Sequence, residues 1–396
     1  MRERNNKLLR FFDYFFGIPL IFLLGLIKKI SDKVNKKVIN LKSIKRIKRP
    51  KIGILKEAAI GDLVLLTGIL KDIESNFPEA KVFLICSESN HEITALFDTK
   101  VDLKVLVFPF SKFFKLMKMV FALPAFDIWM DFGQWPRINA LITFFVRAKL
   151  KVGFRTKGQF RHYVYDLVVD HSSFKHELDN FREFLIKLDL NTGNMPYLKV
   201  IEKEINLPEK FVILHIFPGG SRANLKSWHR NNWAMLGKYL LENGFKIILT
   251  GLKKDFPSAE VLKWQLEHFG YNGSFVMNKA GEWNLEETVF AISKANCVVS
   301  VDTSIVHIAS ALGANLVALY GPTTPERWGP LNKNSVAVKA SVDCGPCLSL
   351  GFESKCLHNR CMELIKVEDV IEKVKVFLTF SLLMLFAILT SAVLPV

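Results

Sequence analysis

The residues Asp302, Thr303 and Ser304, with His307 shortly after them, suit the binding of an anionic ligand. They follow the apolar run Cys297–Val301, which predicts a buried strand, and a helical pattern comes next. Thr303 and Ser304 are expected in the first helical turn, where unpaired backbone N–H groups and the helix dipole favour negative charge. The alternative is structural: a capped helix with His307 satisfied in the core.

Asp62 is a second candidate for chemistry. It ends a loop, Lys56–Asp62, in which Gly61 permits a tight turn before a helical pattern begins. Aspartate is a preferred helix N-cap, because its carboxylate accepts a backbone N–H. The same carboxylate could act as a general base that takes a proton from an attacking hydroxyl. Both interpretations stay open at this point.

Two further loops have the composition of ligand contacts. In Phe217–Arg222 two glycines would let backbone N–H groups approach a phosphate, while Ser221, Arg222 and the later Lys226 supply donors and positive charge. It is not a Walker P-loop, because the Gly-Lys-Ser/Thr ending is missing. The other, Gly321–Pro330, is rich in proline and glycine, which is typical of a shaped loop.

The elements that must position these loops are alternating strands and helices. Continuous apolar strands of this kind predict parallel sheets covered on both faces, in two Rossmann-like halves. A stretch rich in Asn, Gly, Pro and charge, Leu190–Pro208, is the expected linker. The expected strands are Lys51–Leu55, Lys81–Cys86, Val105–Phe108, Ile128–Asp131, Lys151–Phe154, Phe211–Ile216, Phe245–Gly251, Cys297–Val301 and Leu316–Tyr320. In open sheets of this type ligands bind beyond the carboxyl ends of the strands.

The N-terminal region predicts contact with a membrane surface. Phe11–Ile27 is largely apolar, and Lys28–Lys51 holds eleven lysines or arginines against one acid, out of a net charge of +16 for the whole chain. Lysines rather than a small-residue cleavage site follow the apolar run, which disfavours a signal peptide. We expect an interfacial or re-entrant anchor, continued by an amphipathic helix through Ile30, Val34, Val38 and Leu41. The alternative is a solvated basic helix.

The C-terminal segment Val376–Val396 has 21 residues and no charge, which predicts a transmembrane helix. The lysines before it would place its N-terminal side in the cytoplasm. A buried C-terminal helix is the alternative.

Four of the six cysteines crowd together at Cys344, Cys347, Cys356 and Cys361. Four thiolates could hold a structural Zn²⁺ ion or an iron–sulfur cluster, but the spacing fits no standard finger. A reduced thiol cluster is the other interpretation, and we predict no metal or cofactor for the activity.

Taken together, the loops resemble the heptosyltransferases of lipopolysaccharide synthesis, glycosyltransferase family nine. The resemblance covers about residues 51–375. The matching stretches are Gly61-Asp62 with the Leu-Val-Leu-Leu-Thr that follows, Pro218-Gly219 with Lys226-Ser227-Trp228 and Trp233, Asp302-Thr303-Ser304 with His307 and Ala309, and Ala318–Thr323 through Arg327–Pro330.

The resemblance implies a GT-B fold, with an acceptor domain over 51–205, a nucleotide-sugar domain over 206–375 and a cleft between them. It implies inverting transfer of heptose from ADP-heptose to a lipopolysaccharide-core or other lipid-linked glycan, without a required metal, at the cytoplasmic face of the bacterial inner membrane. Asp62 matches the proposed base and Lys226 a residue at the donor diphosphate. Ser221, Asp302, Thr303, Ser304 and His307 match donor-site positions.

Two residues depart from the family pattern: Ser304 stands where glycine is usual, and His229 where proline often follows. Transfer of another sugar in surface-glycan assembly is therefore an alternative, as is a non-catalytic nucleotide- or glycan-binding membrane protein. No aromatic residues interleave the N-terminal lysines, so we expect no nucleic-acid partner.

Overall fold

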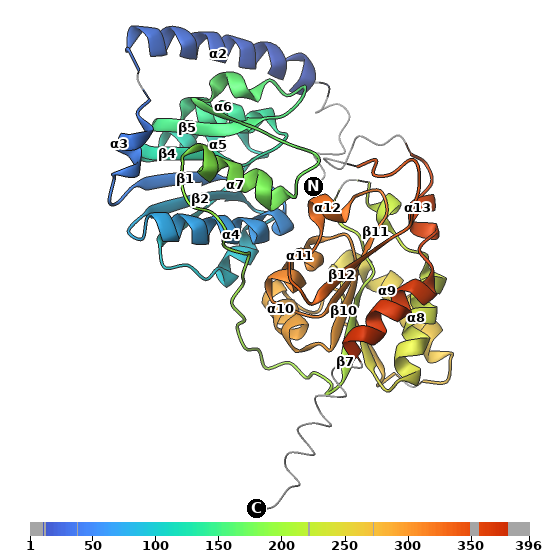
Figure 1. The fold of residues 1–396 in the computed structure, drawn as a ribbon. Helices are drawn as coiled ribbons and strands as arrows, with labels where there is room; N and C mark the ends of the chain where they lie inside the picture. The colour runs from blue at the N-terminus through green and yellow to red at the C-terminus, as the bar shows by residue number, and fades with distance from the viewer. Residues whose placement is uncertain are drawn as a thin grey trace, which may run out of the picture. The chain divides into compact units, whose positions relative to one another are not determined.

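The apolar runs form two six-stranded sheets in which all the strand pairs are parallel (Figure 1). The computed structural model describes residues 11, 13–37, 39–220, 222–271, 273–348 and 356–378. The chain divides into two compact units, Met1–Tyr197 and Leu198–Val396, and each unit contains one sheet.

The sheet of the first unit has the order β3-β2-β1-β4-β5-β6. Its strands are β1 (Lys51–Leu55), β2 (Lys81–Ser87), β3 (Asp102–Phe108), β4 (Phe126–Asp131), β5 (Ala148–Arg155) and β6 (Leu167–Asp170). β1 and β4 are central strands. β1 is buried from Ile52 onward, and β4 is buried along its whole length apart from the half-buried Asp127, which explains their nearly continuous apolar sequences. Gly53 is required within β1, because a Cβ there would lie 2.3 Å from the Trp129 ring.

Helices of the first unit form two groups, as right-handed crossovers on either side of β1 require. One group packs α4 (Ile60–Asn76) against η2 (His91–Leu96) and α7 (Glu177–Lys187). The other packs α6 (Arg137–Phe145) against α5 (Phe113–Phe121), η3 (Arg161–Val164) and the N-terminal α2 (Gly17–Val34). A short helix, α3 (Leu41–Lys45), precedes β1.

The second sheet repeats the pattern in the order β12-β11-β10-β7-β8-β9. Its strands are β7 (Phe211–His215), β8 (Lys246–Leu249), β9 (Val276–Asn278), β10 (Cys297–Val301), β11 (Leu316–Tyr320) and β12 (Ser335–Lys339). The helices are η4 (Ala223–Lys226), α8 (Arg230–Glu242), η5 (Lys253–Asp255), α9 (Phe256–Glu267), α10 (Leu285–Lys294), α11 (Ser304–Ala311), α12 (Pro325–Trp328) and α13 (Arg360–Glu363), and residues 367–378 are also helical.

Strand register decides which loops lie together. Leu55 at the end of β1 pairs with Ile85 and with Asp131 of β4, so the segments that follow β1 and β4 leave the sheet side by side. In the second sheet Ser300 of β10 pairs with His215 of β7, and Val301 pairs with Leu319 of β11. The loops after β7, β10 and β11 therefore share one edge.

The expected parallel sheets are confirmed, and the expected strands match β1, β2, β3, β4, β5, β7, β8, β10 and β11 within a few residues. The prediction of one amphipathic helix continuing to Leu41 is wrong. The helix ends at Val34, Lys36 has a φ of 45°, and α3 starts anew after an Asn40 cap. Val38 and most of the C-terminal segment, residues 379–396, lie outside the described residues.

Candidate active site

Asp62 lies in the first turn of α4, and its two carboxylate oxygens have different surroundings. Oδ2 accepts a hydrogen bond from the backbone N–H of Ala59 at 2.9 Å, so one oxygen does serve the helix terminus. Oδ1 is buried and has no hydrogen-bond partner among the described residues. Since a buried polar atom normally has a partner, Oδ1 is suited to accept a proton or hydrogen bond from a bound hydroxyl.

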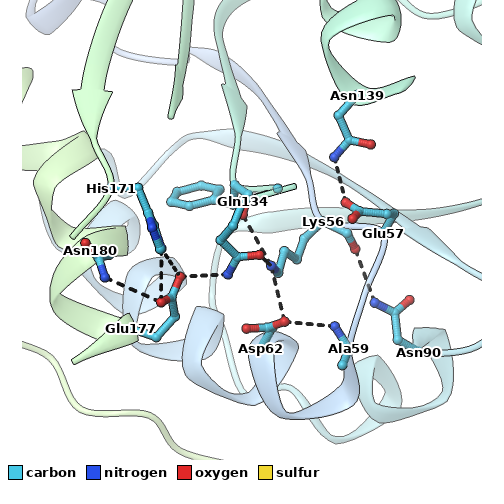
Figure 2. A network of polar contacts seen from close by, with 12 residues as sticks. Lys56, Glu57, Ala59, Asp62, Asn90, Gln134, Asn139, His171, Glu177 and Asn180 are labelled. Carbon is cyan, nitrogen blue, oxygen red and sulfur yellow. Dashed lines mark hydrogen bonds and ion pairs between the residues drawn. The ribbon is translucent and has the colours of Figure 1, made fainter. Parts of the chain in front are cut away.

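Lys56 holds the other side of this carboxylate (Figure 2). Its side chain is fully buried directly after β1, and Nζ lies 3.2 Å from Asp62 Oδ2. Nζ also donates to Gln134 Oε1 at 2.8 Å and to the Phe132 carbonyl at 3.3 Å. A buried ammonium is tolerated only when it is paired and hydrogen-bonded, and Lys56 meets both conditions.

The network continues beyond Gln134 to a buried acid. Gln134 Nε2 donates to Glu177 Oε1 at 2.7 Å, and His171 Nε2 lies 3.0 Å from the same oxygen. Asn180 contributes a longer bond to Oε2. The network thus connects segments that follow β1, β4 and β6 with the first turn of α7, and Figure 2 shows Lys56 at its centre. Its effect is to fix the position of Nζ, and with it the Asp62 carboxylate.

In the second unit Lys226 and Asp302 form an ion pair, with 2.9 Å between Nζ and Oδ2. Thr323, in the loop after β11, donates to the same oxygen at 2.7 Å. Burial alone would raise the pKa of Asp302, but the charge of Lys226 and the hydrogen bonds from Lys226 and Thr323 hold that pKa below its ordinary value. Asp302 is therefore ionised at neutral pH and fixes the Lys226 ammonium at the carboxyl edge of the sheet.

The helix after Asp302 starts one residue later than expected. Thr303 is the N-cap rather than part of the first turn, and its Oγ1 accepts from the Ile305 N–H at 3.2 Å. Ser304 is the first helical residue and His307 is buried on α11, with its ring 6.3 Å from that of Trp328.

The loop after β7 completes the surroundings of Lys226. Gly220 has a φ of 82° and Arg222 one of 55°, so the chain turns through left-handed conformations that Gly220 adopts without strain. His215 ends β7, and burial lowers its pKa to about 4, so its ring is neutral at neutral pH and lies 2.9 Å from Thr250. Ser221, expected at the donor, lies outside the described residues.

The model of glycosyltransferase family 9 (heptosyltransferase) matches residues 126–358, more than half of the chain and the whole of the segment from Lys226 to Trp328. The chain belongs to glycosyltransferase family 9. It is 33% identical over 142 residues to lipooligosaccharide heptosyltransferase 2 of Haemophilus influenzae, a match that covers 36% of this chain and 40% of that protein. The chain thus spans about two fifths of the length of this curated relative.

Other family 9 relatives match over a greater length at lower identity. The lipopolysaccharide core heptosyltransferase OpsX of Haemophilus influenzae is 25% identical over 81% of this chain and 95% of its own. The solved structure of ADP-heptose lipopolysaccharide heptosyltransferase II of Escherichia coli has a TM-score of 0.66 at 18% identity, and covers 84% of this chain and 99% of that one. This likeness establishes the fold, and the two parallel α/β sheets are consistent with a GT-B-like arrangement.

Within this family 9 chain, the structure brings together Lys226, Asp302 and Thr303 at one edge of the second sheet, with His307 one turn further along α11. Asp62 lies in the first unit, at the edge beyond β1. Sequence reasoning gave no individual role to Lys56, Glu177, His215 or Thr323, although Thr323 lies in one of the stretches that match the family. A charged or polar residue at or just after the end of an apolar strand was the available signal for Lys56 and His215, whereas nothing in the sequence marked Glu177.

The four late cysteines line a cavity of about 210 Å³ together with His358. None of the four is in a disulfide in the described part of the chain, and burial raises the pKa of the Cys361 thiol, with a further rise from nearby Cys347 and Cys344. Across the residues that the structure describes, no three His, Cys, Asp or Glu side chains are placed to share a metal ion.

Proposed function

We propose that this chain is an inverting heptosyltransferase that moves heptose from ADP-heptose to a lipopolysaccharide-core or other lipid-linked glycan. The observation that carries the proposal is the family 9 match over 126–358, which contains the Lys226–Asp302 ion pair. The relatives are named as lipooligosaccharide or lipopolysaccharide heptosyltransferases, which supports heptose as the sugar.

In the proposed reaction, Asp62 takes the proton of the acceptor hydroxyl through Oδ1. The acceptor oxygen forms a bond to the anomeric carbon, the bond from that carbon to the diphosphate breaks, and ADP leaves with the electron pair. The configuration at the anomeric carbon is inverted. Lys56 keeps the base in place and adds a fixed positive charge beside its carboxylate.

We propose that residues 206–375 bind the nucleotide-sugar and residues 51–205 the acceptor. Lysine has three N–H donors, and Asp302 uses only part of that capacity, so the remaining donors of Lys226 can meet the departing diphosphate. Thr303, Ser304 and the start of α11 would add backbone N–H groups and the helix dipole, with His307 on the same helix. Ser221 stays a proposed donor-site residue through its match to the family pattern. Positive charge from the protein would take the place of a divalent cation.

We also propose that the enzyme works on the cytoplasmic face of the bacterial inner membrane, with α2 lying in the lipid interface. By length and composition one described helix, Asp13–Val34, could cross a membrane. However, Ile21 and Leu24 are buried against the first unit, and Lys28 pairs with Asp166 at 2.7 Å. The opposite side exposes large apolar side chains: Phe15, Phe16, Leu20, Leu23, Leu26, Ile27 and Ile30. A helix with one face on the domain and the other apolar and exposed suits an interfacial position.

The donor is tested by calorimetry with ADP-heptose, UDP-glucose and GDP-mannose. We expect ADP-heptose to bind at least about 10-fold more tightly than the other two, because base-specific polar contacts discriminate by 1.4 kcal/mol or more. Equal or tighter binding of a UDP- or GDP-sugar would contradict the assignment of the donor. It would favour the alternative of another sugar, to which the unusual Ser304 also points.

A further inference from the structure

A cavity of about 360 Å³ opens at the amino edge of the first sheet, the edge opposite to that of Asp62. It lies where β1, β4 and β5 begin, and its lining includes Arg49, Lys51, Arg147 and Lys149. The proposed reaction uses none of these residues. Four cations around one hollow need an explanation, because like charges brought together repel one another.

The cavity has an excess of positive charge even after its carboxylates are counted. Asp127 is the acid in the lining; it pairs with Lys149 at 2.7 Å and accepts from the Lys51 backbone N–H. Four cations less one carboxylate leave +3, or +2 when Glu79, the partner of Arg49, is included. Within the described chain Arg147 donates to the Leu123 carbonyl and has no carboxylate partner. A concave surface with such a charge attracts anions.

Two exposed aromatic residues, Phe121 and Phe145, lie close in sequence to residues that line or support this cavity. Phe145 lies two residues before Arg147 in the sequence. Phe121 lies two residues before Leu123, whose carbonyl accepts the hydrogen bond from Arg147. The Phe121 and Phe145 rings are in contact at 5.4 Å and are 59% and 37% exposed. On the same helix α5, Phe114 is 88% exposed, and Lys115 and Lys118 are exposed as well. Aromatic and basic side chains in this mixture are typical of surfaces that lie on anionic lipid.

Phe144 connects these rings to α2. Phe144 packs against the cluster that holds Ile21 and Leu24 of α2, and its ring contacts Phe145 at 5.1 Å. Lys28 and Lys37 of the N-terminal region both pair with Asp166, which directly precedes β6. Because β6 lies next to β5, the basic end of α2 and the cavity share the same edge of the sheet.

We propose that the cavity binds the phosphate of an anionic phospholipid headgroup, while Phe121 and Phe145 enter the lipid beside it. The proposal rests on the interfacial position of α2 and gives the first unit a second contact with the membrane. Two separate contacts would fix how the unit is oriented on the membrane surface, which a single amphipathic helix does not do. The charge of the cavity and the exposed Phe121–Phe145 pair, which Phe144 connects to α2, select a lipid headgroup over a soluble anion.

The test is flotation of the full chain with two kinds of vesicle, one of phosphatidylcholine alone and one with phosphatidylglycerol as about a quarter of the lipid. In Arg147→Glu/Lys149→Glu we expect binding to the anionic vesicles to fall at least about 25-fold, since each basic residue at an anionic surface contributes a factor of about five. The control Lys187→Glu/Lys210→Glu changes the net charge by the same amount as the cavity variant, at one position on α7 and one directly before β7. We expect the control to bind the vesicles as the wild type does. Arg147→Gln, which leaves the Lys149–Asp127 pair intact, should show a smaller loss of about fivefold.

Loss of the proposed headgroup site and loss of the α2 contact give different results. Leu23→Asp/Ile27→Asp on α2 should weaken binding to both kinds of vesicle, whereas the cavity variants should affect only the anionic ones. The cavity proposal is overturned if its variants bind like the wild type, if the control loses binding equally, or if inorganic phosphate occupies the cavity without affecting flotation. If only the α2 variant loses binding, the interfacial position of α2 is supported and the headgroup site is rejected.

Discussion

Replacing Asp62 with asparagine is expected to lower kcat for heptosyl transfer by about 10²–10⁴-fold, the contribution typical of a positioned general base. The asparagine can still accept the Ala59 N–H through its side-chain oxygen, so α4 should keep its terminus. It cannot take a proton from the acceptor hydroxyl. The rate is measured with saturating ADP-heptose, and ADP affinity by calorimetry should be unchanged.

Two companion variants separate chemistry from structure. Asp102→Asn removes an exposed carboxylate of the same unit, the partner of Lys81, and should leave kcat unaltered. Lys56→Met keeps the Asp62 carboxylate but removes the ammonium that positions it, and we expect kcat to fall about 10-fold with little change in donor affinity. Thermal unfolding of each variant shows whether the protein is folded. Near-normal transfer by a folded Asp62→Asn enzyme would exclude Asp62 as the base.

Lys226→Ala is expected to weaken ADP binding by roughly 10- to 100-fold, because charge-assisted hydrogen bonds to the diphosphate contribute about 1.5–3 kcal/mol. The change also leaves the buried carboxylate of Asp302 without its cation, so binding must be measured well below the melting temperature of the variant. Calorimetry with ADP gives the affinity directly, without the acceptor.

The matched control is Lys238→Ala, which removes an exposed lysine of α8 in the same unit and should leave ADP affinity as it is. Lys226→Arg keeps the charge but changes the geometry, and we expect an intermediate loss. An unchanged affinity in Lys226→Ala, with the protein folded, would mean that the diphosphate does not contact this lysine.

The sequence predicted the strands of both sheets well, because strands buried on two faces have nearly continuous apolar runs. It predicted less well where an element is partly exposed. β12 is half-buried along most of its length, so its sequence has no clear pattern. At the N-terminus the helical spacing of apolar residues suggested one long helix. In the structure α2 ends at Val34, and the backbone is left-handed at Lys36 before α3 begins.

Part of the candidate site was also predictable. The strand at Cys297–Val301 followed by a helix is confirmed, and the resemblance to family 9 is confirmed by the match over 126–358. The partners of the charged residues were not predictable. Lys226 meets Asp302 because η4 follows β7, and β7 is the sheet neighbour of β10, a relation that only the strand order reveals. Lys56 likewise reaches Gln134 through the pairing of β1 with β4.

Transfer of heptose by the purified chain, followed by mass spectrometry of a lipid-linked core glycan, tests the proposed activity most directly. We predict that ADP-heptose in the presence of a chelator yields a product heavier by one heptose, with the anomeric configuration inverted by NMR. We predict also that Asp62→Asn forms this product only at a residual rate. No product from the folded wild-type chain, under conditions in which a heptosyltransferase relative forms one, would contradict the proposed function.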